Sequence, residues 1–184
     1  MFVGFRALSD FIPPEAIEGR RKVLLIRDPR DMLTSLYFSI AFSHVVPEAG
    51  EARDRVLARR EMARNISIDE FILSAGIDEK VIHNYRQYMQ IINADWVIYR
   101  YEDIIFNKRQ WVHDLTRDLD LPVSRFAANR IANKNDVIPK TPNPQDHIRQ
   151  VKPGNHREVL KPSTIKALDE RFEDILDRFG YNAR

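Results

Sequence analysis

The fold is decided by the stretch Lys22-Val-Leu-Leu-Ile-Arg27-Asp28-Pro29-Arg30-Asp31-Met-Leu-Thr34-Ser35. Residues 23–26 are aliphatic without polar alternation, which is typical of a strand buried on both faces of a parallel sheet. Asp28 fits a helix N-cap and Pro29 the first helical position, and apolar residues then recur at helical spacing through residue 40. Asp31, at the third helical position, is expected to reach back to the free amides of the helix start. The pattern predicts a strand, a tight turn and a helix.

Two polar residues of this stretch are placed to bind a ligand. Arg27 follows the predicted strand directly, at the end where open α/β sheets bind ligands, and Ser35 lies two turns into the helix. A guanidinium offers a planar fork of donors and a hydroxyl adds one short hydrogen bond, a combination suited to phosphate. We therefore expect Arg27 and Ser35 to hold a phosphate group. An ordinary capped helix after an ordinary strand is the alternative.

This segment resembles the 3′-phosphate-binding motif of sulfotransferases that use 3′-phosphoadenosine 5′-phosphosulfate (PAPS). The motif runs Arg-x-Pro-x-Asp-x-x-x-Ser after a buried strand, and Arg27, Pro29, Asp31 and Ser35 match it. In the family the arginine and the serine bind the 3′-phosphate. The resemblance implies the same roles for Arg27 and Ser35.

A second segment also resembles the family. Residues 96–103, Trp-Val-Ile-Tyr-Arg-Tyr-Glu-Asp, read as another buried strand and match a family strand that ends in Tyr-Glu-Asp. Tyr101 takes the place of the tyrosine that contacts the nucleotide. A helical pattern over residues 108–119 then leads to Leu121-Pro122, as the family's helix leads to its Gly-[Ile/Leu]-Pro.

A third segment, residues 148–157, resembles the family's late loop Arg-Lys-Gly-x-x-Gly-Asp-Trp-[Lys/Arg]. Arg149, Gly154 and Arg157 match that pattern. The resemblance implies that Arg149 and the two residues after it close over the nucleotide. The three matches occur in the family's order and at roughly its spacing.

The late loop also departs from the family pattern. Gln150 replaces the lysine, so it can donate hydrogen bonds without bringing charge, and Val151 replaces a glycine and restricts close approach of the backbone to a phosphate. His156 stands where tryptophan is usual, and Lys152 offers a charge two residues further on. A solvated basic loop is the alternative.

Two family features have no counterpart before Arg27. The 5′-phosphosulfate loop, Pro-Lys-[Ser/Ala]-Gly-Thr-[Thr/Ser], cradles phosphate with backbone amides. Only Gly4 and Gly19 precede Arg27, and neither lies in such a loop. The usual base, a histidine before the 3′-phosphate strand, is missing because the first histidine is His44. We therefore expect the carboxyl-terminal part of a sulfotransferase domain, inactive by itself and with its catalytic residue unassigned.

Composition narrows the classes of function and of binding site that remain. The 184 residues carry a net charge of +2, too small to favour nucleic acid, and we expect a single partial domain over residues 1–184. Zero cysteines exclude disulfides and thiolate metal sites and favour the cytoplasm. The histidines show no metal-ligand spacing, and the longest nearly apolar stretch is too short and polar for a membrane span.

Further elements follow from local patterns. Ser67 and Ser163 are expected to cap helices, and the last helix to run from Ser163 to about residue 179 and stop at Gly180. A run of arginines is expected to form a solvated face, or else to contact an acidic acceptor. It comprises Arg53, Arg55, Arg59, Arg60 and Arg64.

Together these patterns predict an α/β fold: a parallel sheet flanked by helices, of the P-loop NTPase-like sulfotransferase type, without its amino-terminal strand and loop. The expected reaction transfers a sulfuryl group from PAPS to a hydroxyl or amine of a small-molecule or carbohydrate acceptor, leaving PAP, with no metal required. One alternative is a non-catalytic relative that binds nucleotide or serves assembly. The other is a P-loop nucleoside or nucleotide kinase, weakened because no Gly-Lys-[Ser/Thr] loop is present. An open sheet edge also predicts self-association.

Overall fold

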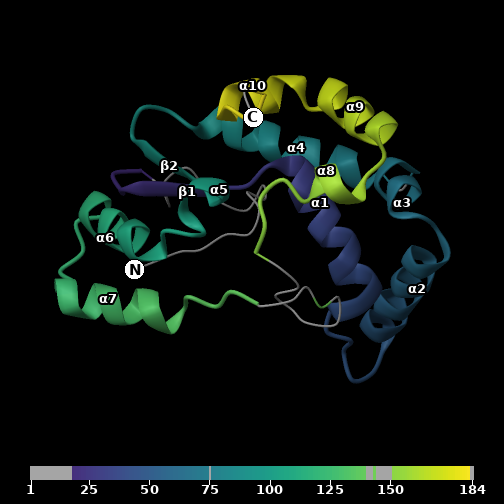
Figure 1. Cartoon of the computed structure of the whole chain (residues 1–184), viewed down its shortest axis with the longest axis horizontal. Helices are drawn as coiled ribbons and strands as arrows, with labels where there is room; N and C mark the ends of the chain where they lie inside the picture. The colour runs from purple at the N-terminus through teal and green to yellow at the C-terminus, as the bar shows by residue number, and fades with distance from the viewer. Residues whose placement is uncertain (1–17, 75, 140–142, 144–150, 183–184) are drawn as a thin grey trace. The chain divides into compact units, whose positions relative to one another are not determined.

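The structure is a computed structural model and describes residues 18–74, 76–139, 143 and 151–182. Its described part is mostly helical with one small parallel sheet (Figure 1). In chain order the elements are β1 (Lys22–Ile26), α1 (Pro29–Phe38), the π-helix η2 (Ser39–Ser43), α2 (Glu51–Asn65), α3 (Ile68–Ser74), α4 (Ile77–Ile91), β2 (Trp96–Arg100), α5 (Tyr101–Ile104), α6 (Lys108–Asp118), α7 (Arg125–Lys134), α8 (His156–Val159), α9 (Pro162–Arg171) and α10 (Glu173–Phe179).

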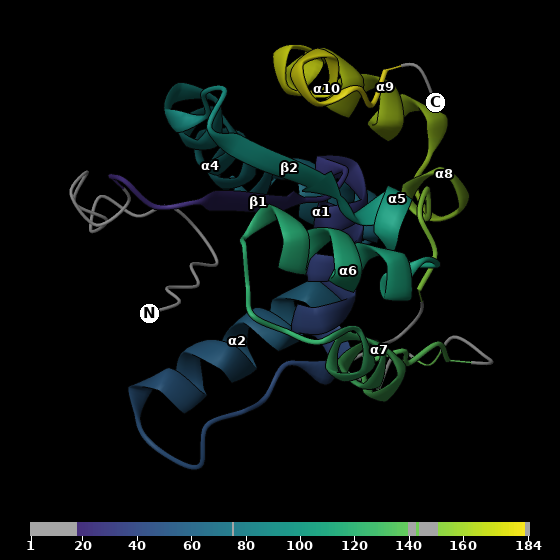
Figure 2. The same ribbon diagram turned by 90° about the vertical axis from the view of Figure 1, so that its left-hand side faces the viewer.

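The chain divides into two compact units, which we describe separately. The strand unit comprises Met1–Arg27 and His83–Val137, and the helical unit comprises Asp28–Ile82 and Ile138–Arg184. Figure 2 shows the strand unit's β1 and β2 side by side, with α6 and α7 following in the same unit. The expectation of a single domain over residues 1–184 stays a prediction.

The sheet confirms the predicted parallel strands but not their burial. β1 pairs with β2 in a register that runs from Lys22↔Trp96 to Ile26↔Arg100. The prediction that the strands are buried on both faces is wrong, since Leu25 is 48% exposed and Ile98 36% exposed. Register partners point to the same face, so these two residues lie on opposite faces. Among the described residues the sheet has only two strands, and each face is covered only in part.

The helical unit is built around α1. Asp28 is its N-cap, with Oδ1 accepting from the Arg30 amide at 2.9 Å, and Pro29 occupies the first turn, as predicted. Helices α3 and α8 both pack against α1. The core contains large side chains with no exposed surface: Leu33, Phe71, Ile72, Leu168, Phe172, Ile175 and Leu176.

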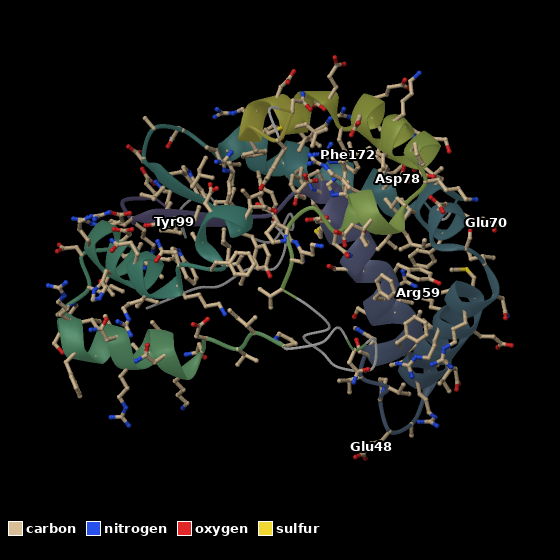
Figure 3. The ribbon with its side chains drawn as sticks, in the orientation of Figure 1. Glu48, Arg59, Glu70, Asp78, Tyr99 and Phe172 are labelled. Carbon is tan, nitrogen blue, oxygen red and sulfur yellow. The ribbon has the colours of Figure 1, made fainter. Side chains whose placement is uncertain are left out.

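The C-terminal segment forms two helices where the sequence predicts one. The first helix starts at Pro162 with Lys161 as N-cap, so the prediction of Ser163 as the cap is wrong; proline is favoured at this first helical position. The helical run breaks at Phe172, whose side chain is fully buried. Figure 3 labels Phe172 together with Asp78, whose carboxylate accepts a charged hydrogen bond from Arg171. The predicted stop at Gly180 is confirmed, with φ of 71° in the left-handed region that glycine tolerates.

The predicted arginine run on α2 is only partly solvated. Arg60 donates to the main-chain oxygens of Ile40 and His44, and Arg64 Nε donates to the Ala41 oxygen at 2.7 Å. The Arg64 guanidinium also lies 5.5 Å from the centre of the Phe42 ring. These two arginines therefore hold η2 against α2, whereas Arg55 forms an exposed pair with Glu51. No helix in the described part of the chain has the length and apolar character that a bilayer crossing requires.

A buried ion network ties the start of α1 to α9. Arg30 donates through Nε and Nη2 to Asp28, at 3.0 and 2.6 Å, and through Nη1 to Asp169 at 2.6 Å. The Arg30 and Asp28 side chains are only 6% and 9% exposed. Burial opposes the charge on Arg30, but the hydrogen bonds with Asp28 and Asp169 outweigh it and raise the pKa of Arg30. Arg30 therefore stays charged, and Arg30 and Asp28 each compensate the cost of burying the other.

Removing one partner of this network should destabilise the chain strongly. Arg30→Met leaves the buried Asp28 carboxylate without its guanidinium, and such a loss costs about 3–5 kcal/mol of unfolding free energy. The matched control is Arg55→Met, which breaks an exposed pair and should cost about 0.5 kcal/mol. Urea unfolding measures both. Equal losses in the two variants would contradict a special role for Arg30.

Candidate functional site

Arg27 lies at the carboxyl end of β1, where the sequence predicts it. Ile26 is the last residue of the strand and is buried, and it is in register with Arg100 at the end of β2. The Tyr85 hydroxyl donates to the Arg27 main-chain oxygen at 2.5 Å. Because Tyr85 is itself only 4% exposed, this bond fixes the backbone from which the Arg27 side chain extends.

Tyr101 lies next to Arg27. It is the first residue of α5, directly after β2, and the Arg27 guanidinium carbon stands 4.6 Å from the centre of its ring. That distance is a cation–π contact, which holds a guanidinium over an aromatic face. Both side chains are half-buried. Two residues predicted from separate motifs are thus brought together by the parallel register.

A tyrosine and an aspartate join β2 to α6. The Tyr99 hydroxyl, labelled in Figure 3, donates to Asp118, and its ring lies edge-on to Trp111 with centroids 6.2 Å apart. Burial and the hydrogen bond to Asp118 together raise the pKa of Tyr99. Tyr99 therefore stays neutral and ties β2, which leads directly into Tyr101, to α6.

Ser35 belongs to the helical unit. It is half-buried on α1, one helical turn after Asp31, and spacing of four residues places both side chains on one face of the helix. Arg27 therefore belongs to the strand unit and Ser35 to the helical unit.

Asp31 makes contacts that differ from the prediction. It does not reach back to the amides of α1; Oδ2 accepts from the Gly154 amide at 2.6 Å, and Oδ1 accepts from the His156 amide at 2.9 Å and from His156 Nδ1 at 2.7 Å. Asp31 has no exposed surface. These contacts of Asp31, Gly154 and His156 form what we name the Asp31 clamp, which attaches the end of the late loop to the helix that carries Ser35.

The electrostatics and the backbone geometry of the Asp31 clamp both favour its hydrogen bonds. Burial acts to raise the pKa of Asp31, but the hydrogen bonds from His156 and Gly154 outweigh it and hold that pKa below its ordinary value of 3.8. Gly154 has φ of 77°, which favours glycine and lets its amide point at the carboxylate. His156 is 1% exposed, and its Nε2 has no hydrogen-bond partner among the described residues. His156 is thus a buried residue of the clamp.

The remaining predicted site residues are only partly described. Arg149 and Gln150 lie outside the described residues, so their expected contact with nucleotide stays a prediction. Val151 is half-buried in the helical unit, three residues before Gly154. Lys152 pairs with Glu158 at the surface. The Asp31 clamp is not predictable from the motif that contains Asp31, because the partners of Asp31 lie 123 and 125 residues away.

The clamp predicts a specific pH dependence of stability. Asp31→Asn replaces one acceptor oxygen by a donor that faces an N–H group, and should cost about 3 kcal/mol at neutral pH. Because the folded pKa of Asp31 is lowered, its contribution is complete above about pH 4 and is lost as pH falls through the folded value. The wild-type unfolding free energy should therefore fall more steeply than that of the variant below about pH 4.

A control separates the clamp from the general effect of an acid near a helix start. Asp54 lies in the first turn of α2 and is exposed. Asp54→Asn should therefore lower the unfolding free energy by about 0.5 kcal/mol and leave its fall below about pH 4 unchanged. Urea titrations at several pH values measure both variants. Parallel pH profiles for wild type and Asp31→Asn would argue against the clamp.

Comparison with known proteins adds no evidence for function to the sequence motifs of Arg27, Tyr101 and the late loop. No protein-family model, curated protein or solved structure matches the chain. The resemblance to sulfotransferases therefore rests on the residues quoted above and on the geometry of Arg27, Tyr101 and the Asp31 clamp. The function that follows from them is a proposal.

Proposed function

We propose that this chain is part of a PAPS-dependent sulfotransferase with a P-loop NTPase-like fold. In this proposal Arg27 and Ser35 hold the 3′-phosphate, Tyr101 contacts the nucleotide, and Arg149, Gln150 and Val151 close over it. The observation that carries the proposal is the contact between Arg27 and Tyr101, at 4.6 Å, where β1 and β2 end together.

The geometry of this contact suits a phosphate-bearing nucleotide. The carboxyl ends of parallel strands are the usual ligand-binding edge of such sheets. Tyr101 supports the guanidinium of Arg27 from one side, and Tyr85 fixes the backbone of Arg27. A planar cation held in place binds a phosphate with less loss of side-chain freedom than a mobile one.

Two further features support the same assignment. The Asp31 clamp attaches the segment after Arg149, Gln150 and Val151 to the helix of Ser35, so within the helical unit the end of the late loop is tied to the helix that carries the proposed phosphate-binding serine. Asp120, just before Leu121-Pro122, has φ of 52°, a conformation that favours glycine. The family has a glycine before this Ile/Leu-Pro pair.

The proposed chemistry resembles phosphoryl transfer. The bond between sulfur and the bridging phosphate oxygen of PAPS breaks, a bond from sulfur to the acceptor oxygen or nitrogen forms, the acceptor's proton passes to a base, and PAP leaves. Positioning and charge neutralisation supply most of the catalysis in such reactions. The residues matched here serve the 3′ end of the donor; neither the base nor the group that holds the 5′-phosphosulfate is among them.

A second candidate function is nucleotide binding without catalysis. It is favoured by one observation, that the described residues matched to the family, Arg27, Ser35 and Tyr101, have roles in nucleotide binding and include no catalytic base. Both candidates require PAP to bind at Arg27, and a sulfuryl-transfer assay with PAPS distinguishes them. Transfer to a hydroxyl or amine acceptor supports the enzyme, and PAP binding without transfer supports the binding protein.

Replacing Arg27 should weaken PAP binding. Arg27→Ala removes charge-assisted hydrogen bonds worth about 1.5–3 kcal/mol, and Arg27→Lys should recover little because a point charge does not replace a planar fork. The matched control is Arg21→Ala, in the same unit but 58% exposed and paired with Asp120. Calorimetry with PAP measures all three. Unchanged affinity in Arg27→Ala would remove the proposed function.

The site should also distinguish a nucleotide with a 3′-phosphate from one without. PAP should stabilise the chain against heat more than 5′-AMP, because 5′-AMP leaves the donors of Arg27 and Ser35 without their phosphate partner. Ser35→Ala should reduce the advantage of PAP without affecting 5′-AMP. Thermal-shift measurements with both nucleotides provide the comparison. Equal stabilisation by the two would favour a kinase-like site.

A further inference from the structure

The strand unit contains a hollow between α6 and α7, apart from the proposed nucleotide site. Its volume is about 650 Å³, and it is lined by Arg109, Phe126, Asn129, Arg130, Asn133 and Lys134. It is a surface hollow that is open to solvent, and most of its lining side chains are exposed. None of the lining residues belongs to the motifs that point to PAPS.

Two hydrogen bonds between side chains join the helices at this hollow. Arg109 Nη2 donates to Asn133 Oδ1 at 3.1 Å, and His113 Nε2 lies 2.9 Å from Asn129 Oδ1. The second contact lies four residues further along α6 than the first, and four residues earlier along α7. Helices α6 and α7 are therefore antiparallel here, and the lining positions 126, 129, 130, 133 and 134 share one face of α7.

These bonds decide what the hollow offers to a ligand. The amide oxygens of Asn129 and Asn133 each accept a hydrogen bond already, from His113 and Arg109. What the two amides then offer is chiefly N–H donors. Arginine and lysine are donors only, so the polar lining is made of donors and positive charges.

The carboxylates near this hollow pair with other cations. Asp114 accepts from Arg117 at 2.7 Å, and Asp136 pairs with Lys108 at 2.9 Å. No carboxylate among the described residues forms an ion pair with Arg109, Arg130 or Lys134. The hollow therefore presents a net positive charge of three.

An exposed aromatic ring completes the lining. Phe126 is 79% exposed, the largest exposure of any aromatic residue in the described part of the chain. It stands one helical turn before Arg130 and two before Lys134. A ring-shaped ligand can cover the apolar face of Phe126 while its acidic group meets the two cations.

We propose that this hollow binds a small anion built on a ring, with the ring against Phe126 and the acidic group at Arg130 and Lys134. Acidic sugars and nucleotides share this chemistry. The positive charges of the lining select for the anion, and the exposed ring selects for a flat or ring-shaped body. The inference does not depend on the sulfotransferase proposal.

The experiment uses two acids and their neutral counterparts. Glucuronic acid with glucose, and uridine 5′-monophosphate with uridine, are titrated separately into the 184-residue chain and followed by NMR chemical shifts. Each acid, and neither neutral compound, should give saturable shifts on α6 and α7. The tighter of the two acids identifies the source of the ligand.

Matched variants locate the binding. Arg130→Ala with Lys134→Ala should weaken binding of the acid about tenfold, whereas Arg125→Ala, on the same helix but outside the lining, should leave it unchanged. Phe126→Ala should weaken it about fivefold, and its control Ile131→Ala, 48% exposed and outside the lining, should not.

The proposal is overturned by any of three results. These are no saturable shifts with either acid, equal binding of the neutral compounds, or equal weakening by Arg125→Ala and by the double variant. The last result would mean that only the general charge of α7 attracts anions. Loss of PAP binding in Arg27→Ala tests the nucleotide site and leaves this result unaffected, so the two proposals can fail separately.

Discussion

The helical unit depends on one carboxylate that has no contact with water. Asp31 lies in the first turn of α1, and a buried charge of this kind is costly unless donors surround it. Three N–H groups from Gly154 and His156 supply that compensation. Since α8 begins at His156 and leads on to α9 and α10, the same bonds fix where the last third of this unit starts. The position of Gly154 and His156, at the end of the late loop, thus follows from one buried acid.

The parallel register has the same importance in the strand unit. Once Ile26 is paired with Arg100, the next residue of each strand, Arg27 and Tyr101, must emerge at the same edge. Neither residue needs a long-range contact of its own to find the other. Of the candidate site residues, the strand unit supplies this cation–aromatic pair, and the helical unit supplies Ser35 and Val151. The two groups are linked by the peptide bond between Arg27 and Asp28.

Features of the fold that depend on neighbouring residues could be predicted from the sequence. The cap at Asp28, the cap at Ser67, where Ser67 Oγ accepts from the Glu70 amide, and the stop at Gly180 all depend on residues within four positions, which a sequence displays directly. The partner of Asp31 could not be predicted, because spacing says nothing about a bond across more than 120 residues. The break at Phe172 was missed for a related reason. No glycine or proline marks it in the sequence.

The π-helix η2 has a consequence for how this chain can change in length. A π-turn holds one residue more than an α-turn, and here Arg60 and Arg64 bind the main-chain oxygens of Ile40, Ala41 and His44. Deletion of one residue at this point would convert the π-turn into an α-turn. Asp31 and Ser35 lie upstream and would keep their helical register. The end of α1 is therefore a site where length can vary while the turns that carry Asp31 and Ser35 stay unchanged.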